Sequence, residues 1–147
     1  MEFKKASEKV LEKVLFDPYV YAYFCSDYSP IYEQALPSDY EDYDWYCNLE
    51  ETILFIVKEG YPGVFEVHTA ALRGSRGREV FKAYRGFKKY IKDVLGGLKL
   101  ILTIPSDNRP AQVAAVQAAG AKRILVLKNA VAKHRFFHDM YIYEVEL

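Results

Sequence analysis

The sequence has few cysteines, and it lacks any apolar run long enough to cross a bilayer. Two cysteines, Cys25 and Cys47, cannot form a disulfide framework, so we expect reduced thiols, with a single disulfide between them as the alternative. No uncharged apolar stretch reaches the roughly 18 residues that a membrane helix needs. The opening segment, "MEFKKASEKVLEKVLF", is charged throughout and has no signal-peptide core. These features predict a cytoplasmic protein that does not enter a membrane.

The formal net charge is zero, but the two signs are separated along the chain. Residues 17–60 contain ten acidic residues and one basic residue, Lys58, whereas residues 61–147 contain fifteen basic and seven acidic residues. This asymmetry indicates an anionic ligand for the second half, or contact between the halves. An acidic loop beside a mildly basic surface is the plainer interpretation, but it does not explain why the bases cluster.

Hydrophobic periodicity predicts one domain with a mixed α/β (α+β) fold. With 147 residues, half of them apolar, the chain can bury one core. Residues 26–47 show no clear period and are expected to be mostly irregular. Strands 98–105 and 122–131 are almost continuously apolar, which predicts burial on both faces. The expected helices are 8–16, 18–25, 77–94 and 108–120, and the expected strands are 49–60, 61–72, 98–105, 122–131 and 140–147.

The segment "RGSRGR", residues 73–78, joins an expected strand to a basic amphipathic helix. A helix start carries unpaired amide groups and the positive end of the helix dipole, and both favour phosphate. Gly74 and Gly77 allow a ligand close to the backbone, while the three arginines can add charge-assisted hydrogen bonds. The apolar stripe of this helix is Val80, Phe81, Tyr84, Phe87, Ile91 and Val94. The bases share one face away from that stripe; they are Arg78, Lys82, Arg85, Lys89 and Lys92.

Other phosphate and nucleic-acid motifs fit this segment less well. "RGSRGR" lacks the third glycine of a dinucleotide-binding fingerprint, and the chain has no Gly-Lys-Ser/Thr of a Walker loop. The basic and aromatic run "YRGFKKYIK" is compatible with nucleic-acid binding. Its aromatics lie on the apolar stripe, however, and the net charge is zero, so core packing explains them better.

These motifs resemble the GCN5-related N-acetyltransferase (GNAT) superfamily over about residues 49–147. In that family a Gln/Arg-x-x-Gly-x-Gly/Ala turn holds the pyrophosphate of acetyl-coenzyme A (acetyl-CoA), and "RGSRGRE" stands at that place here. The segment "LTIPSDNRPAQVAAVQAAGAKRILV" resembles the family's next strand and helix. The resemblance implies an acyl-CoA N-acyltransferase fold, a mostly antiparallel central sheet flanked by helices. The residues that it implies for acetyl-CoA are Leu72, Arg73, Gly74, Ser75, Arg76, Gly77, Arg78, Asn108 and Ala111.

The sequence also departs from the family pattern. Glu79 stands where a glycine or alanine is usual, and Ala121 follows Gly120 in place of phenylalanine. The helix 108–120 is one residue longer than expected, and "AAVQAAGA" lacks the tyrosine that often protonates the leaving thiolate. The combination of Glu-x-His-Thr, Arg-Gly and Asn-Arg-Pro-Ala resembles a subgroup often encoded by bacteriophages, which would place the protein in the host cytoplasm.

Glu66 and His68 are the candidate catalytic residues. They are two apart on an expected strand, so both side chains point to one face. A histidine can accept the proton of an amine near neutral pH, and Glu66 can act directly or through water. A structural histidine and a salt bridge to the arginines are the alternatives. Ser106 is a weak candidate for the acid, and Tyr84, on the apolar stripe, is set aside.

Two other kinds of site are weaker. His134 and His138 are four apart in "HRFFHD", but Phe136 and Phe137 argue against a helix there, so no metal is expected. Cys25 has no basic neighbour that would make it a nucleophile.

The sequence thus predicts an N-acetyltransferase that uses acetyl-CoA and an unidentified primary amine. The acidic, tyrosine-rich residues 28–46 are expected to border the acceptor. A catalytically inactive binding or structural module of the same fold, with a phage or host protein or a second copy as partner, is the alternative.

Overall fold

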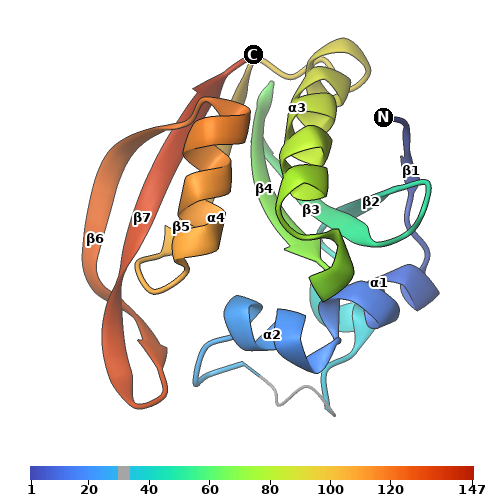
Figure 1. Ribbon diagram of the computed structural model, residues 1–147. Helices are drawn as coiled ribbons and strands as arrows, with labels where there is room; N and C mark the ends of the chain where they lie inside the picture. The colour runs from blue at the N-terminus through green and yellow to red at the C-terminus, as the bar shows by residue number, and fades with distance from the viewer. Residues whose placement is uncertain (30–33) are drawn as a thin grey trace.

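A mixed seven-stranded sheet with helices on both faces forms the computed structural model, which describes residues 1–29 and 34–147 (Figure 1). The strand order is β1-β2-β3-β4-β5-β7-β6, and every neighbouring pair is antiparallel except β4 and β5. The predicted mixed, mostly antiparallel sheet is therefore confirmed. The strands are β1 (Phe3–Lys5), β2 (Asp44–Asn48), β3 (Ile53–Tyr61), β4 (Val64–Ala71), β5 (Lys99–Pro105), β6 (Lys122–Lys133) and β7 (Phe136–Glu146).

The parallel contact between β4 and β5 is short. Val64, Phe65 and Glu66 of β4 pair with residues 99–101 of β5. β4 continues to Ala71 and β5 to Pro105, but the two strands do not pair with each other beyond this point. The two strands therefore separate beyond Glu66, and the second half of β4 has β3 as its one paired neighbour in the described structure. The strands expected at 49–60 and 61–72 form an antiparallel hairpin, β3–β4.

Two helices cover one face of the sheet, and the first two helices cover the other. α3 (Arg78–Asp93), α4 (Arg109–Ala114) and the π turn Ala115–Ala119 pack on a core that contains Phe55 and Val67. α1 (Glu8–Leu15) and α2 (Pro18–Phe24) pack on a second cluster that contains Leu54 and Ile56. Because side chains alternate along a strand, each face of β3 and β4 has its own core.

Local signals place the helices as the sequence predicts. The helix expected at 8–16 forms as α1, and its buried residues, Val10, Leu11, Val14 and Leu15, lie on one stripe. Asp17 caps α2, accepting hydrogen bonds from the amides of Tyr19 and Val20 at 3.0 and 3.2 Å, with Pro18 as the first helical residue.

The longer helix at 108–120 is accommodated by a change of helix type. Its last turn, Ala115–Ala119, is a π turn, which takes up one extra residue without displacing the flanking core. Gly120 then ends the helix with a left-handed backbone (φ +73°).

Three expectations about packing are wrong. β6 is an edge strand, and Ile124, Leu125 and Leu127 are largely exposed rather than buried. β5 alternates between buried and half-buried residues instead of being covered on both faces. Val94 is exposed, and Ala83 takes its place in the α3 stripe. An apolar run does not reveal which strands end at the sheet edge, since that depends on the order of strands.

The segment expected to be irregular contains regular structure at its end. Residues 37–40 form a 3₁₀ turn and Asp44–Asn48 form β2, which pairs with β1 and β3. Part of that segment, residues 30–33, lies outside the described residues. Cys25 and Cys47 are both free thiols. Among the described helices, none is long and apolar enough to span a bilayer.

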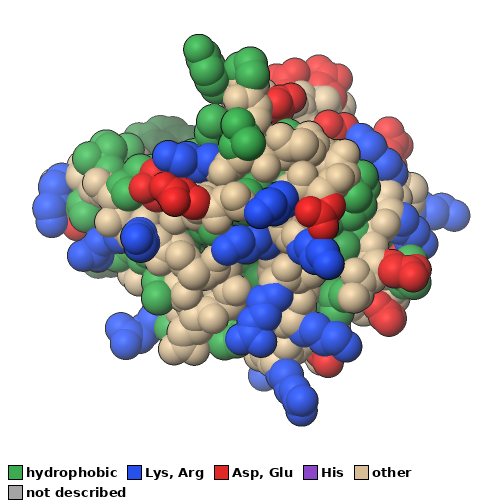
Figure 2. All heavy atoms as spheres, turned by 90° about the horizontal axis from the view of Figure 1, so that it is seen from above, with side chains coloured by type: hydrophobic (Ala, Val, Ile, Leu, Met, Phe, Trp, Pro, Cys, Tyr) green, Lys and Arg blue, Asp and Glu red, His purple; other side chains and the backbone are tan. Residues whose placement is uncertain are grey.

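The basic side chains of α3 lie on its exposed face, as expected. Seen from the end of the molecule where α3 finishes, Lys and Arg side chains spread over the surface with Asp and Glu between and around them (Figure 2). The mixture of signs on this face offers no continuous basic path for a nucleic-acid backbone.

Candidate functional site

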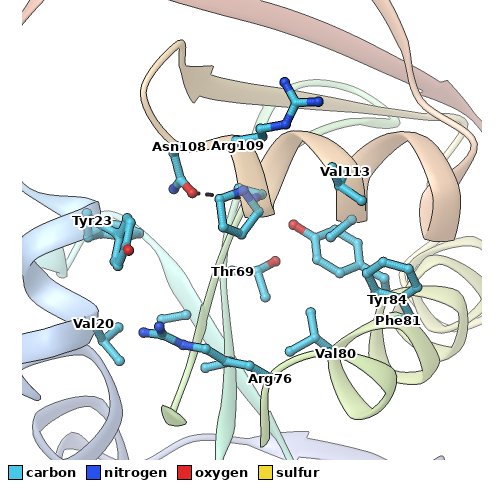
Figure 3. A pocket seen from close by; sticks show the side chains of 17 residues that line it. Val20, Tyr23, Thr69, Arg76, Val80, Phe81, Tyr84, Asn108, Arg109 and Val113 are labelled. Atoms are coloured by element: carbon cyan, nitrogen blue, oxygen red, sulfur yellow. Dashed lines mark hydrogen bonds between the residues drawn. The ribbon is translucent and has the colours of Figure 1, made fainter.

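A cavity of about 590 Å³ opens between α2, α3 and α4 (Figure 3). It lies beside the free half of β4, the part beyond Glu66 that does not pair with β5. Its walls are mostly apolar, and Thr69 lies between the three helices in the close-up view. The polar side chains in the lining are Tyr23 on α2, Thr69 on β4, Arg76 before α3, Tyr84 on α3, Asn108 before α4 and Arg109 on α4. The apolar lining includes Val20, Phe24, Val80, Phe81, Val113 and Ala114.

The start of α3 forms one end of this cavity. Gly77 precedes the helix with φ +78° and ψ −122°, a backbone conformation that glycine adopts far more readily than other residues. Phe81 N donates the first helical hydrogen bond, to Gly77 O at 3.1 Å, so the amides of residues 78–80 have no intrahelical acceptor. Gly77 supplies no side-chain cap. This helix start can therefore accept an anion.

Two arginines before α3 stack on tyrosines of α2. The guanidinium carbon of Arg76 lies 5.4 Å from the ring centre of Tyr23, and that of Arg73 lies 5.5 Å from the ring centre of Tyr19. Such cation–π contacts hold the guanidinium groups between α2 and the loop. Glu79, the departure from the family pattern, is exposed and does not line the cavity, so its charge is directed away from it.

The residues expected to bind a cofactor fall into two groups. Arg76, Gly77, Asn108 and Ala111 line the cavity together. The remaining five, Leu72, Arg73, Gly74, Ser75 and Arg78, belong to the loop and helix start outside its lining. The amide of Leu72 is already used, because it donates to Thr52 O at 2.9 Å. Which of these residues touch a ligand stays a prediction.

Asn108 has a structural task as well as a place in the cavity. Its Oδ1 accepts a hydrogen bond from Ala111 N at 3.3 Å and so caps α4. Ser106, the weak candidate for an acid, is tied to β7 instead: its Oγ accepts from Asp139 N at 3.1 Å, and it does not line the cavity.

Glu66 and His68 meet on the opposite face of β4. Glu66 Oε1 lies 2.8 Å from His68 Nε2, and the imidazole ring is held by edge contacts with Phe24 and Tyr43, at ring-centre distances of 5.7 and 6.1 Å. The hydrogen bond to His68 is the main cause that lowers the pKa of the Glu66 carboxyl, and partial burial opposes it. Both side chains are partly exposed, so a ligand can reach them.

Glu66 and His68 lie where β4 separates from β5. Glu66 is the last residue of β4 that pairs with β5, and His68 lies just beyond it. Glu66 and His68 do not line the cavity, but the next residue, Thr69, does. Phe24 lines the cavity and also contacts the His68 ring, so the pair lies beside the cavity.

His134 and His138 do not form a metal site. His134 lies in the β6–β7 turn with φ +53°, where Asp27 Oδ1 accepts a hydrogen bond from its amide at 2.8 Å, and His138 lies within β7. Across residues 1–29 and 34–147, no group of three or more potential metal ligands occurs.

Comparison of structures shows what this fold is similar to. The spermidine N-acetyltransferase from Vibrio cholerae, solved with CoA and spermine, superposes with a TM-score of 0.78 at 10% identity, over 99% of this chain and 94% of that one. A GNAT-family acetyltransferase from Bacillus anthracis gives 0.72 at 13% identity, over 98% and 93% of the two chains. The chain has the GNAT fold.

A third GNAT-fold protein, from Salmonella typhimurium and solved with its cofactor acetyl-CoA, gives 0.73 at 12% identity, over 99% of this chain and 93% of that one. No family model matches the sequence. No curated protein matches it either. The bacteriophage subgroup has no support in these comparisons. At such low identities the likeness to solved structures concerns the fold.

Sequence reasoning set Tyr84 aside, and it did not identify Thr69 or the residues of α2 that form a wall of the cavity. Val20, Tyr23 and Phe24 line the cavity from α2, a contact between distant segments that periodicity cannot reveal. The sequence does contain a signal for both Thr69 and Tyr84. Thr69 follows His68 on a strand and must face the other side, and Tyr84 lies one turn after Val80 on the α3 stripe.

Proposed function

We propose that this protein is an N-acetyltransferase that moves an acetyl group from acetyl-CoA to a primary amine. The observation that carries the proposal is the uncapped helix start at Gly77, which opens beside Arg76 into an apolar cavity along the free half of β4. The amides of residues 78–80 and the loop arginines would bind the diphosphate, and the apolar walls would enclose the pantetheine arm. GNAT-fold neighbours solved with CoA or acetyl-CoA support this assignment.

His68 and Glu66 are proposed to prepare the amine. If Nε2 of His68 donates to Glu66, Nδ1 is left as the acceptor for the proton that the amine loses on attack. Glu66 would fix that tautomer and stabilise the imidazolium that forms. Phe24 and Tyr43 would hold the ring in place. The amine would approach from the α1/α2 face and the thioester from the cavity face.

A cationic acceptor is favoured by charge. Residues 17–60 carry ten acidic residues against Lys58, and this half of the chain supplies α2 and Tyr43 beside His68. The Vibrio cholerae relative was solved with spermine, a cationic amine. A polyamine is therefore the first acceptor to test, followed by a panel of small primary amines.

The decisive experiment has two steps. Acetyl-CoA well above its dissociation constant should raise the thermal midpoint, because ligand binding at about 100–1,000 times that constant adds about 2.7–4.1 kcal/mol. Acetylated product should then form with at least one amine, and His68→Ala and Glu66→Gln should each lower kcat about 10²-fold or more. Unchanged rates in both variants would remove the catalytic pair while leaving the fold assignment intact.

The second candidate is a catalytically inactive binding module of the same fold. The observation that favours it is the alanine-rich α4 and π turn, which present no tyrosine to the cavity. A module of this kind would bind CoA, or bind nothing, and give no product with any amine. The same two steps separate the candidates.

A further inference from the structure

The sulfur of CoA has to be protonated when CoA leaves. No side chain of α4 in the cavity lining has a hydroxyl that could supply this proton. The side chains of α4 that line the cavity are Arg109, whose guanidinium points away from Thr69 and Tyr84 in Figure 3, and the apolar Pro110, Ala111, Val113 and Ala114. Ser106 is bonded to Asp139 and does not line the cavity. A thiolate released among apolar walls is poorly solvated, so its charge has to be neutralised by a nearby donor. The hydroxyls that do line the cavity belong to Tyr23, Thr69 and Tyr84.

Thr69 and Tyr84 form a pair of hydroxyls in the depth of the cavity. In Figure 3 the Tyr84 hydroxyl points from α3 toward Thr69, and no completed hydrogen bond joins them. Among the described residues, Thr69 Oγ1 stands out as a buried side-chain oxygen without a hydrogen-bond partner. Tyr84 itself is 8% exposed, with its ring held edge-on by Phe55 at a ring-centre distance of 6.0 Å. The Thr69 hydroxyl still lowers the pKa of the Tyr84 hydroxyl, so the two groups lie close enough to act together on a ligand in the cavity.

The fold places these hydroxyls opposite the candidate base. His68 and Thr69 are consecutive on β4, so their side chains leave opposite faces of the strand. The register confirms the alternation, since Ile56 is opposite His68 and Phe55 is opposite Thr69. A thioester bound where β4 and β5 separate can thus be reached from both faces of β4. The amine meets His68 on one side, and the sulfur meets Thr69 and Tyr84 on the other.

We propose that Tyr84 is the proton donor for the leaving thiolate and that Thr69 is a positioning residue for its hydroxyl. This inference rests on the proposed acetyl transfer. It assigns protonation of the leaving thiolate to a residue of α3 in place of α4. In the step, the carbon–sulfur bond of the tetrahedral intermediate breaks and its electron pair goes to sulfur. The phenolic proton of Tyr84 moves to that sulfur, giving the free thiol of CoA. The phenolate regains a proton from solvent, while the proton taken from the amine leaves His68 to solvent.

The protonation state of Tyr84 agrees with this role. Burial is the main cause that raises the pKa of the Tyr84 hydroxyl, and the nearby Thr69 hydroxyl offsets part of that increase. The phenol therefore keeps its proton at neutral pH and is available as a donor. A raised pKa also makes the phenol a weaker acid, and burial of the thiolate in the same cavity compensates by making the thiolate a stronger base.

The test compares Tyr84→Phe with Tyr90→Phe, which removes a phenolic oxygen from the same helix outside the cavity lining. Tyr84→Phe should keep the thermal shift with acetyl-CoA and the KM for acetyl-CoA, but lower kcat about 10²-fold or more. Tyr90→Phe should keep wild-type kcat. Thr69→Val should lower kcat less than Tyr84→Phe does, and Thr69→Ser, which restores the hydroxyl, should recover most of the loss.

A donor with a better leaving group separates proton donation from a structural effect. The selenoester analogue of acetyl-CoA releases a selenolate, which is a much weaker base than a thiolate and leaves without a proton. The kcat ratio of wild type to Tyr84→Phe should therefore shrink toward one with the selenoester. An equal loss with both donors, or a Tyr84→Phe kcat close to wild type with acetyl-CoA, overturns the assignment while acetyl transfer stands. If wild type acetylates no amine, the proposed function fails first, and this inference fails with it.

Discussion

Lys133, buried at the end of β6, forms an ion pair with the more exposed Asp107, which lies just before α4. Their Nζ and Oδ2 atoms are 3.3 Å apart, and Lys133 Nζ also donates to the backbone carbonyl of Tyr23 at 3.3 Å. The Lys133 ammonium group thereby connects the end of β6 to the start of α4 and to the end of α2. α2 and α4 form walls of the cavity, and Lys133 holds them to the sheet. The residue as a whole is 3% exposed.

Replacing Lys133 should loosen this arrangement. Lys133→Met should lower the free energy of unfolding by about 1–3 kcal/mol, because it removes the ion pair and leaves the Tyr23 carbonyl without its donor, while the exposed Asp107 carboxylate stays solvated. Lys128→Met is the matched control: Lys128 pairs with Asp139 at 3.1 Å, but its side chain is 78% exposed, so the loss should stay below about 1 kcal/mol. Urea denaturation of both variants measures the difference, and equal losses would contradict it.

The glycines of the loop should differ in what they contribute. Gly77→Ala places a side chain at φ +78°, and we expect a loss of about 1–3 kcal/mol in unfolding free energy together with weaker acetyl-CoA binding. Gly74 has no such backbone requirement and open space around it, so Gly74→Ala should change stability by less than about 0.5 kcal/mol. Thermal melts with and without acetyl-CoA report both quantities. A Gly77→Ala protein as stable as wild type would show that the helix start tolerates other conformations.

Arg76 should serve ligand binding more than stability. On acetyl-CoA binding its guanidinium is expected to exchange the Tyr23 ring for phosphate, so Arg76→Gln should raise the dissociation constant for acetyl-CoA at least about tenfold, the equivalent of about 1.4 kcal/mol. Arg85→Gln, an exposed change further along α3, should leave that constant within about twofold. Calorimetric titration at two salt concentrations checks both variants. Equal affinity in Arg76→Gln and wild type would exclude Arg76 from the phosphate site.

Glu66 should make stability depend on pH in a defined direction. The folded-state pKa of Glu66 lies below that of a free carboxyl, 4.5, because His68 hydrogen-bonds the ionised form. The stabilisation is therefore present above about pH 4.5 and is lost as the pH falls through the lowered folded value. The difference in unfolding free energy between wild type and Glu66→Gln should be larger at pH 7 than at pH 3. A difference that does not change with pH would mean that the carboxylate is not stabilised in the fold.

Much of the local structure could be predicted from the sequence because its causes are local. Asp17 and Pro18 start α2, Gly77 starts α3, and the two-residue spacing of Glu66 and His68 brings their side chains within a hydrogen bond. β1 and β2 were not predicted, since three and five residues give too short a pattern, and they form by pairing with each other and with β3.

What the sequence determined by itself was periodicity, capping and charge, and these depend on residues within one or two turns of each other. Tertiary structure alone decided that β6 lies at the edge, that β4 separates from β5 after Glu66, and that Tyr84 faces Thr69 across the cavity. Those features depend on which strands become neighbours and how far they stay paired. That choice is made by the burial of the whole chain, which no single segment encodes.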